Sequence, residues 1–117
     1  MPPSLLRKFN RGSIDELITE GVEMEYHRSL IRKKYWGLWK YDSYLIQINP
    51  KLIHYRGRVF EDVVIIHEWL HAYEDIILDL EKDFRETQID WWAYFHLRRD
   101  PYIGEYARSF FPEFKPR

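Results

Sequence analysis

The stretch VVIIHEWLHAYED, residues 63–75, decides the fold of this chain. Apolar residues recur at intervals of three or four from Phe60 to Leu80, which predicts a long helix that ends at about Glu81. The first four residues of the stretch, Val63 to Ile66, are apolar on every side. Such a helix is typical of a buried, central position rather than of the surface.

The pattern HExxH lies inside this predicted helix. Four residues advance a helix by about 6 Å and turn it about 40° past a full circle, so His67 and His71 project from one face. This spacing lets both imidazoles reach one Zn²⁺, and Glu68 can reach the water that the zinc acidifies. We therefore expect a zinc-dependent metallopeptidase (a hydrolase) with His67 and His71 as zinc ligands and Glu68 as the general base.

A catalytic zinc site needs a third protein ligand. If the helix runs to residue 82 and the chain then reverses, a second, antiparallel helix brings His96 to within about 3 Å of the depth of His71. We therefore expect His96 as the third ligand. Glu86 takes this place only if the first helix stops near residues 73–75, and the apolar periodicity beyond that point argues against such a stop.

The rest of the chain predicts a small α+β domain. Ser13 and Glu16 form a capping box, which predicts a helix from Ser13 to about Tyr26. Apolar and β-favouring residues within 35–49 predict two strands, and Gly37 there marks a bulge or a close backbone approach. Residues 1–117 are expected to form one domain.

Composition narrows the classes of function. Of the 117 residues, 45% are hydrophobic and 18% aromatic, which suits a short chain with one core. No cysteine is present, so disulfides and cysteine-ligated zinc sites are excluded. The net charge of −1 gives no electrostatic reason to expect nucleic acid or an anionic membrane as partner. Without an apolar leader or a segment long enough to span a membrane, the chain is expected to be cytoplasmic.

The chain also resembles a known family. The stretch VVIIHEWLH, the preceding LIQINPKLI (45–53) and the later ETQIDWWAYFH (86–96) resemble the minigluzincins, soluble metallopeptidase domains of about this length. The catalytic domains of HtpX-type membrane metallopeptidases are similar. The resemblance implies a zincin-like α+β domain, with a three-stranded sheet packed on about three to four helices and an active-site helix that carries HExxH.

The resemblance bears on the third ligand in two ways. It implies a histidine, in agreement with His96. Glu86 and Asp90, however, have the ExxxD form of the broader gluzincins, in which the glutamate is the third ligand and the aspartate supports a ligand histidine. Both His96 and Glu86 therefore remain candidates.

The resemblance further implies how a peptide or protein substrate binds. An extended substrate pairs with a sheet edge, here expected at Ser43–Asn49. Family members include latent zymogens, and residues 108–117 are a candidate inhibitory C-terminal tail in which Glu113 approaches the metal. Both a monomer and a dimer with a swapped C-terminal helix are compatible with the sequence.

Other residues have candidate supporting roles. Tyr102 and Tyr106 are possible donors to the oxyanion of the reaction. Asp90 or Asp100 would orient a ligand histidine. Two rival functions use the same residues: a zinc-binding or regulatory module without turnover, and an ImmA-type protease dedicated to one partner.

Overall fold

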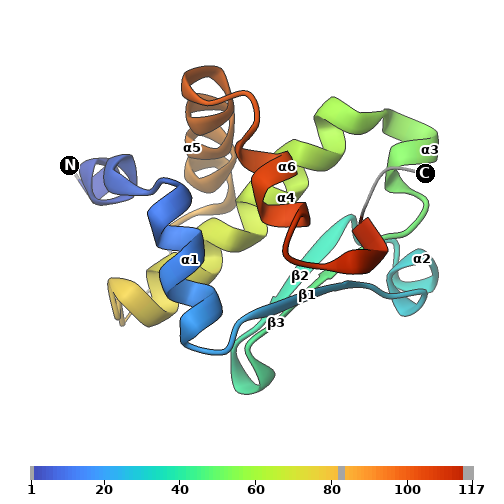
Figure 1. Cartoon of the computed structure of the whole chain (residues 1–117), viewed down its shortest axis with the longest axis horizontal. Helices are drawn as coiled ribbons and strands as arrows, with labels where there is room; N and C mark the ends of the chain where they lie inside the picture. The colour runs from blue at the N-terminus through green and yellow to red at the C-terminus, as the bar shows by residue number, and fades with distance from the viewer. Residues whose placement is uncertain (1, 82–83, 115–117) are drawn as a thin grey trace.

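The computed structural model describes residues 2–81 and 84–114, which form an α+β fold with helices around a three-stranded mixed sheet (Figure 1). The strands are β1 (Glu23–Tyr26), β2 (Gly37–Lys40) and β3 (Leu45–Ile48). The α-helices of the described part are α1 (Arg11–Thr19), α2 (Ser29–Lys33), α3 (Leu52–Arg56), α4 (Arg58–Ala72), α5 (Glu86–Arg99) and α6 (Ile103–Arg108). Short 3₁₀ segments lie at Pro2–Lys8, Tyr41–Ser43 and Pro112–Phe114. The α+β class and the three-stranded sheet are confirmed, whereas the expected three to four helices are six in the described residues.

The strands are ordered β1-β3-β2. β2 and β3 are the two strands expected within 35–49 and form an antiparallel hairpin, whereas β1 pairs with β3 in parallel. The expectation that residues 43–49 form a sheet edge is wrong, because β3 has a partner on each side. β2 is instead the edge strand next to α4.

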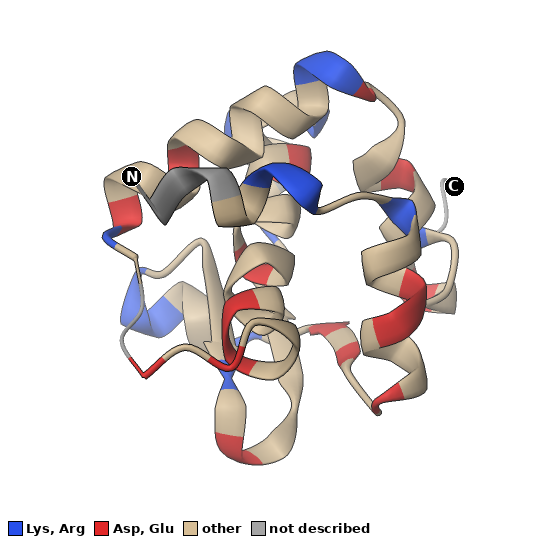
Figure 2. Cartoon of the chain, turned by 90° about the vertical axis from the view of Figure 1, so that its left-hand side faces the viewer, with Lys and Arg blue, Asp and Glu red and all other residues tan. Residues whose placement is uncertain are grey.

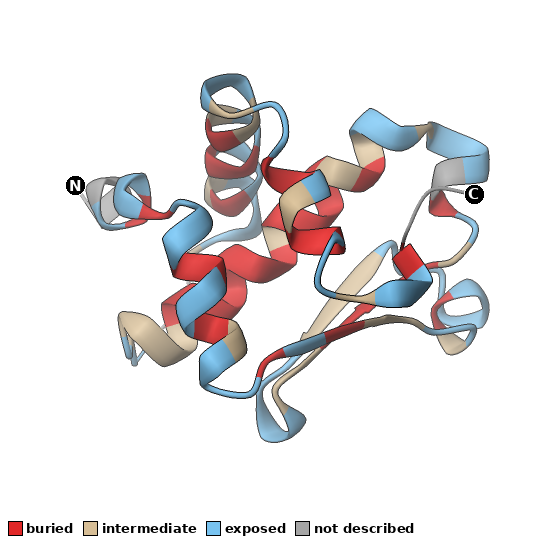
Figure 3. Ribbon diagram, viewed as in Figure 1, coloured by how far each residue is buried: buried red, intermediate tan, exposed pale blue. Residues whose placement is uncertain are grey.

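Helix α4 is the central element, as its apolar sequence predicts. It runs diagonally through the middle of the molecule in Figure 1, with the sheet on one side and α5 on the other. Its buried surface is nearly continuous, and Ile65, Ile66 and Trp69 are fully buried (Figure 3). Each such side chain contributes about 1.5–3 kcal/mol of burial free energy relative to an exposed position.

A buried charge cluster fixes α6 to the start of α4. Arg108 donates to Glu61 Oε1 over 3.1 Å and also pairs with Asp62. The Tyr26 hydroxyl donates to Glu61 Oε2 over 3.0 Å, which adds β1 to the cluster. Gly104 permits this contact, because a Cβ there would lie 2.5 Å from Asp62 Oδ1.

The first helix ends earlier than its apolar pattern predicts. α1 begins after Asn10, whose side chain accepts from the Ser13 N–H, so Ser13 lies inside the helix rather than at its cap. Gly21, with φ of +106°, ends the helix, and Val22 N then donates to Leu17 O over 3.0 Å. This is a Schellman end, and it frees the following residues to form β1.

The expected helix to residue 81 is also interrupted. α4 ends at Ala72 and continues as a π-helical turn, Tyr73–Ile77. Residues 76–78 are half-buried and pack against the core. Their apolar spacing therefore arises from this packing and not from a continued α-helix. The expected reversal at residue 83 lies outside the described residues.

Within the described residues, no helix has both the length and the apolar character to cross a membrane.

Candidate metal centre

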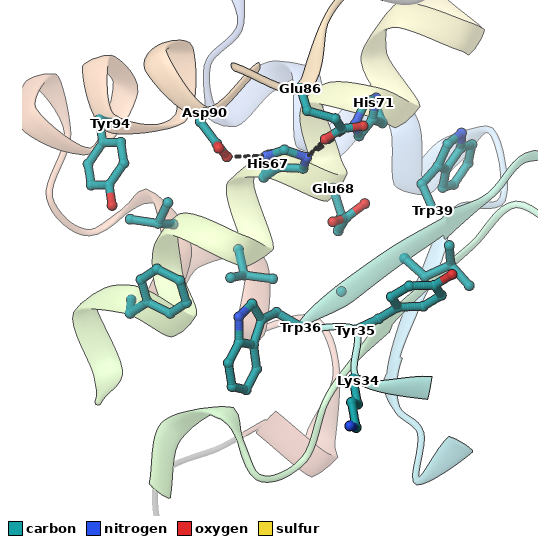
Figure 4. Close-up of a pocket in the computed structure, with 15 residues that line it drawn as sticks. Lys34, Tyr35, Trp36, Trp39, His67, Glu68, His71, Glu86, Asp90 and Tyr94 are labelled. Atoms are coloured by element: carbon teal, nitrogen blue, oxygen red, sulfur yellow. Dashed lines mark hydrogen bonds and ion pairs between the residues drawn. The ribbon is translucent and has the colours of Figure 1, made fainter. Parts of the chain in front are cut away.

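His67 and His71 project from the same face of α4, toward α5 (Figure 4). Their Nε2 atoms lie 3.2 Å apart, with ring centroids separated by 4.9 Å. Both side chains are largely buried, at 12% and 8% exposure. The helical spacing therefore brings the two rings together as the sequence predicts.

Glu86 closes the group from the first turn of α5. One carboxylate oxygen lies 2.5 Å from His67 Nε2 and the other lies 3.1 Å from His71 Nε2. The three candidate ligand atoms lie within 4.8 Å of one another, so the group could hold a metal ion. Ligand atoms of a tetrahedral zinc site are about 3.3 Å apart, given bonds of about 2.0–2.1 Å.

Two further carboxylates hold the other nitrogen of each ring. Asp90 Oδ1 lies 2.6 Å from His67 Nδ1, and Glu74 Oε1 lies 2.7 Å from His71 Nδ1. When Nδ1 donates to a carboxylate, the lone pair of the neutral imidazole is on Nε2, which is the form that binds metal. Two such imidazoles and one carboxylate are a donor set that fits a divalent metal such as zinc.

The protonation of the group without metal follows from the same contacts. Burial disfavours the charged form of His71, but hydrogen bonds to Glu74 and Glu86 outweigh it and raise the pKa to about 10. The hydrogen bond to His71 lowers the pKa of Glu86 to about 2. A metal ion must therefore displace a proton from the ring, so binding strengthens as pH rises.

Glu68 lies beside the group and points into the pocket (Figure 4). Its side chain is buried, and burial raises its pKa to about 7. Gly37 of β2 makes room for it: a Cβ at that position would lie 2.9 Å from Glu68 Oε2 and 2.7 Å from Val64 Cγ1. The expected close backbone approach at Gly37 is confirmed.

His96 does not join the group, contrary to the expectation. It is buried on a different face of α5 from Glu86, and its Nε2 donates to the Leu6 carbonyl over 2.7 Å. The expectation assumed a continuous helix and a tight reversal. Because α4 ends at Ala72, the chain returns early enough for the first residue of α5, Glu86, to meet the histidines.

The predicted oxyanion donors lie elsewhere. The Tyr106 hydroxyl donates to Asp15 over 2.6 Å, and Tyr102 is exposed beside it, outside the pocket. Asp100 accepts a bidentate pair from Arg11 and not from a ligand histidine. The tyrosines that line the pocket are Tyr35 and Tyr94.

The described part of the C-terminal tail also lies away from the pocket. The Glu113 carboxylate accepts from the Tyr26 N–H, and Phe114 stacks on the Tyr26 ring with centroids 4.0 Å apart. These contacts cover the β1 edge, on the opposite side of the sheet from β2. The expected approach of Glu113 to the metal is therefore not seen, and residues 115–117 lie outside the described part.

An open pocket of about 630 Å³ lies in front of the group. Its floor is formed by His67, Glu68 and His71 of α4. One wall comes from residues 34–39, at the start of β2, and the other comes from α5. The pocket thus leaves the candidate metal position accessible to a ligand.

No protein-family model, curated protein or solved structure matches this chain. The interpretation of the site therefore rests on its own geometry.

Glu74 is the site residue that the sequence analysis missed. Its side chain is fully buried and makes two hydrogen bonds. Oε1 bonds to His71 Nδ1, and Oε2 accepts from the Phe84 N–H over 2.6 Å. The second bond fixes the segment that leads into α5. The signal in the sequence is the spacing of three residues after His71, which also fits an exposed helix carboxylate.

Proposed function

We propose that the chain is a zinc-dependent peptidase. His67, His71 and Glu86 hold the metal, and Glu68 is the general base. The observation that carries the proposal is the convergence of two imidazole Nε2 atoms on one carboxylate, with both Nδ1 atoms held by other carboxylates.

The chain's own residues supply the remaining chemistry. A zinc ion, when bound, polarises a carbonyl and makes a water molecule easier to deprotonate. Glu68 takes a proton from the attacking water and returns it to the leaving nitrogen. Asp90 and Glu74 keep the two rings in the metal-binding tautomer.

Strand β2 supports a peptide as the substrate. It is the edge strand of the sheet, and Gly37, Leu38 and Trp39 line the pocket. An extended peptide that pairs with this edge would pass over Glu68, and its main chain would be oriented by the strand. Tyr94, on the opposite wall, is the candidate donor to the oxyanion in place of Tyr102 and Tyr106.

The test is the variant Glu68→Gln, assayed with the zinc-loaded protein on a mixed peptide library read by mass spectrometry. We expect the cleavage rate to fall by about 10²–10⁴-fold, because a general base contributes a factor of this size. The amount of bound zinc should stay at the wild-type level. Glu23→Gln, an exposed carboxylate on β1, is the matched control and should cleave normally.

Two results would contradict the proposal. One is a zinc-loaded wild-type protein that cleaves no peptide, which would leave a binding module without turnover. The other is a Glu68→Gln protein that cleaves at the wild-type rate.

A further inference from the structure

The charges of this chain are unevenly distributed along its length. Residues 27–60 contain eight Lys or Arg and one acidic residue, Asp42, which gives this segment a formal charge of +7. The whole chain has a net charge of −1. The overall balance therefore hides a strongly basic segment.

Most basic residues of the segment lie on or beside α2 and α3, on the right of Figure 1, whereas the β2–β3 hairpin carries Lys40 away from this end. Direct contacts connect its two halves. Asn49 N donates to Trp36 O over 2.8 Å. The Trp36 and Phe60 rings lie nearly perpendicular with centroids 6.3 Å apart, and the Arg56 guanidinium lies 4.2 Å from the centre of the Phe60 ring. We call seven of the exposed Lys and Arg of this segment the basic end: Arg28, Arg32, Lys33, Lys34, Lys51, Arg56 and Arg58.

None of these seven side chains forms an ion pair with a carboxylate of the described residues. Of the acidic residues next to the segment, Glu25 accepts from Gln47, and Glu61 and Asp62 pair with Arg108, although Asp62 also interacts electrostatically with Arg58. The opposite end differs, because Arg11 there pairs with Asp100 and acidic and basic stretches are interspersed (Figure 2).

Exposed apolar side chains accompany the basic end. Val59 is 76% exposed and Tyr55 is 64% exposed, and Ile31, Tyr35 and Trp36 are also exposed. Aromatic and aliphatic side chains among unpaired Lys and Arg are typical of surfaces that insert shallowly into the headgroup region of an anionic bilayer.

We propose that the basic end docks the protein on an anionic lipid bilayer. Of the seven basic residues only Lys34 lines the pocket, so the charge is arranged for a broad surface rather than for an acidic peptide in the cleft. The exposed ring of Tyr55 suits a nucleic-acid base as well as a bilayer, but the aliphatic side chains of Ile31 and Val59 cannot stack on a base and are stabilised among acyl chains.

The proposal does not depend on zinc or on peptide cleavage. Docking would nevertheless fix where the pocket lies relative to the bilayer. Lys34, Tyr35 and Trp36 lie at this end of the molecule and also line the pocket (Figure 4). Docking would hold the mouth of the pocket at the membrane surface.

The test is co-sedimentation of the full chain with vesicles of phosphatidylcholine, with or without phosphatidylserine. The triple variant Arg32→Gln, Lys33→Gln and Lys51→Gln removes three charges of the basic end. The triple variant Arg7→Gln, Lys8→Gln and Arg98→Gln removes three exposed charges elsewhere, with the same change in net charge. Each basic residue at an anionic surface contributes about 1 kcal/mol, or about fivefold, so the first variant should bind about 100-fold more weakly and the second about as well as wild type.

A further double variant, Tyr55→Ser with Val59→Ser, should weaken the binding that remains at high salt. The proposal is overturned if the wild-type protein binds both kinds of vesicle equally or neither, or if both triple variants lose the same affinity. It is also overturned if polyglutamate or a single-stranded oligonucleotide is bound more tightly than the anionic vesicles at the same ionic strength.

Discussion

At the scale of single residues, the candidate metal centre depends on which ring nitrogen of each histidine is already hydrogen-bonded to a carboxylate. HExxH predicts that His67 and His71 face one point, but not which nitrogen faces it. Asp90 and Glu74 decide that question, because each holds an Nδ1 atom. Asp90 was predictable from its spacing after Glu86, whereas Glu74 is separated from an ordinary helix carboxylate only by its complete burial.

Replacing Glu74 by Gln should therefore lower zinc affinity by about 10–100-fold, as is usual when the partner of a ligand histidine is changed. Competition with a chromophoric chelator measures this loss. Glu81→Gln, an exposed carboxylate beyond the π-helical turn, is the matched control. Equal affinity of both variants and wild type would show that Glu74 does not orient His71.

His96 has a different task, which a pH series tests. Burial lowers the pKa of His96, with a smaller opposing effect from the Leu6 carbonyl. The unfolded chain then binds the proton more readily than the folded one, so folding stability falls as pH drops below the ordinary histidine pKa of about 6.5. Relative to His96→Gln, which keeps a donor for Leu6, wild type should lose stability as pH falls below about 6.5, by at most about 1.4 kcal/mol per pH unit. Parallel urea-unfolding stabilities of the two proteins across this range would contradict this role.

At the scale of elements, the sequence predicts where strong patterns begin better than where they end. The β2–β3 hairpin and the body of α4 form as expected. The apolar pattern after Ala72 wrongly predicted a continued α-helix, because apolar residues in a π-helical turn can also pack against the core. Because of this one error, His96 was expected as the third ligand in place of Glu86. The end of α4 determines which residue of α5 faces the two histidines.

The C-terminal segment is a second element whose role changes with the structure. Phe114 is 3% exposed and stacks on Tyr26, so it supports the sheet rather than the pocket. Phe114→Ala should lower the free energy of unfolding by about 3 kcal/mol without raising peptide cleavage. Phe110→Ala, at a residue 42% exposed, should cost much less. A gain in cleavage by a folded Phe114→Ala protein would restore the inhibitory-tail hypothesis.

At the scale of the whole molecule, the arrangement depends on contacts that no local pattern contains. β1 was expected as the end of a helix, so the order β1-β3-β2, and with it β2 as the edge beside Glu68, could not be predicted. The excess of basic residues within 27–60 is visible in the sequence, but the grouping of seven of them at one end follows only from the fold.

The central claim is that Glu86, and not His96, completes the metal centre. The most direct measurement is the zinc content and zinc affinity of the wild type, Glu86→Ala and His96→Gln, each first shown to be folded. We predict one tightly bound zinc in wild type and in His96→Gln, and an affinity more than about 100-fold lower in Glu86→Ala, since losing a ligand costs more than losing its partner. Full zinc affinity in Glu86→Ala together with a loss in His96→Gln would contradict the account.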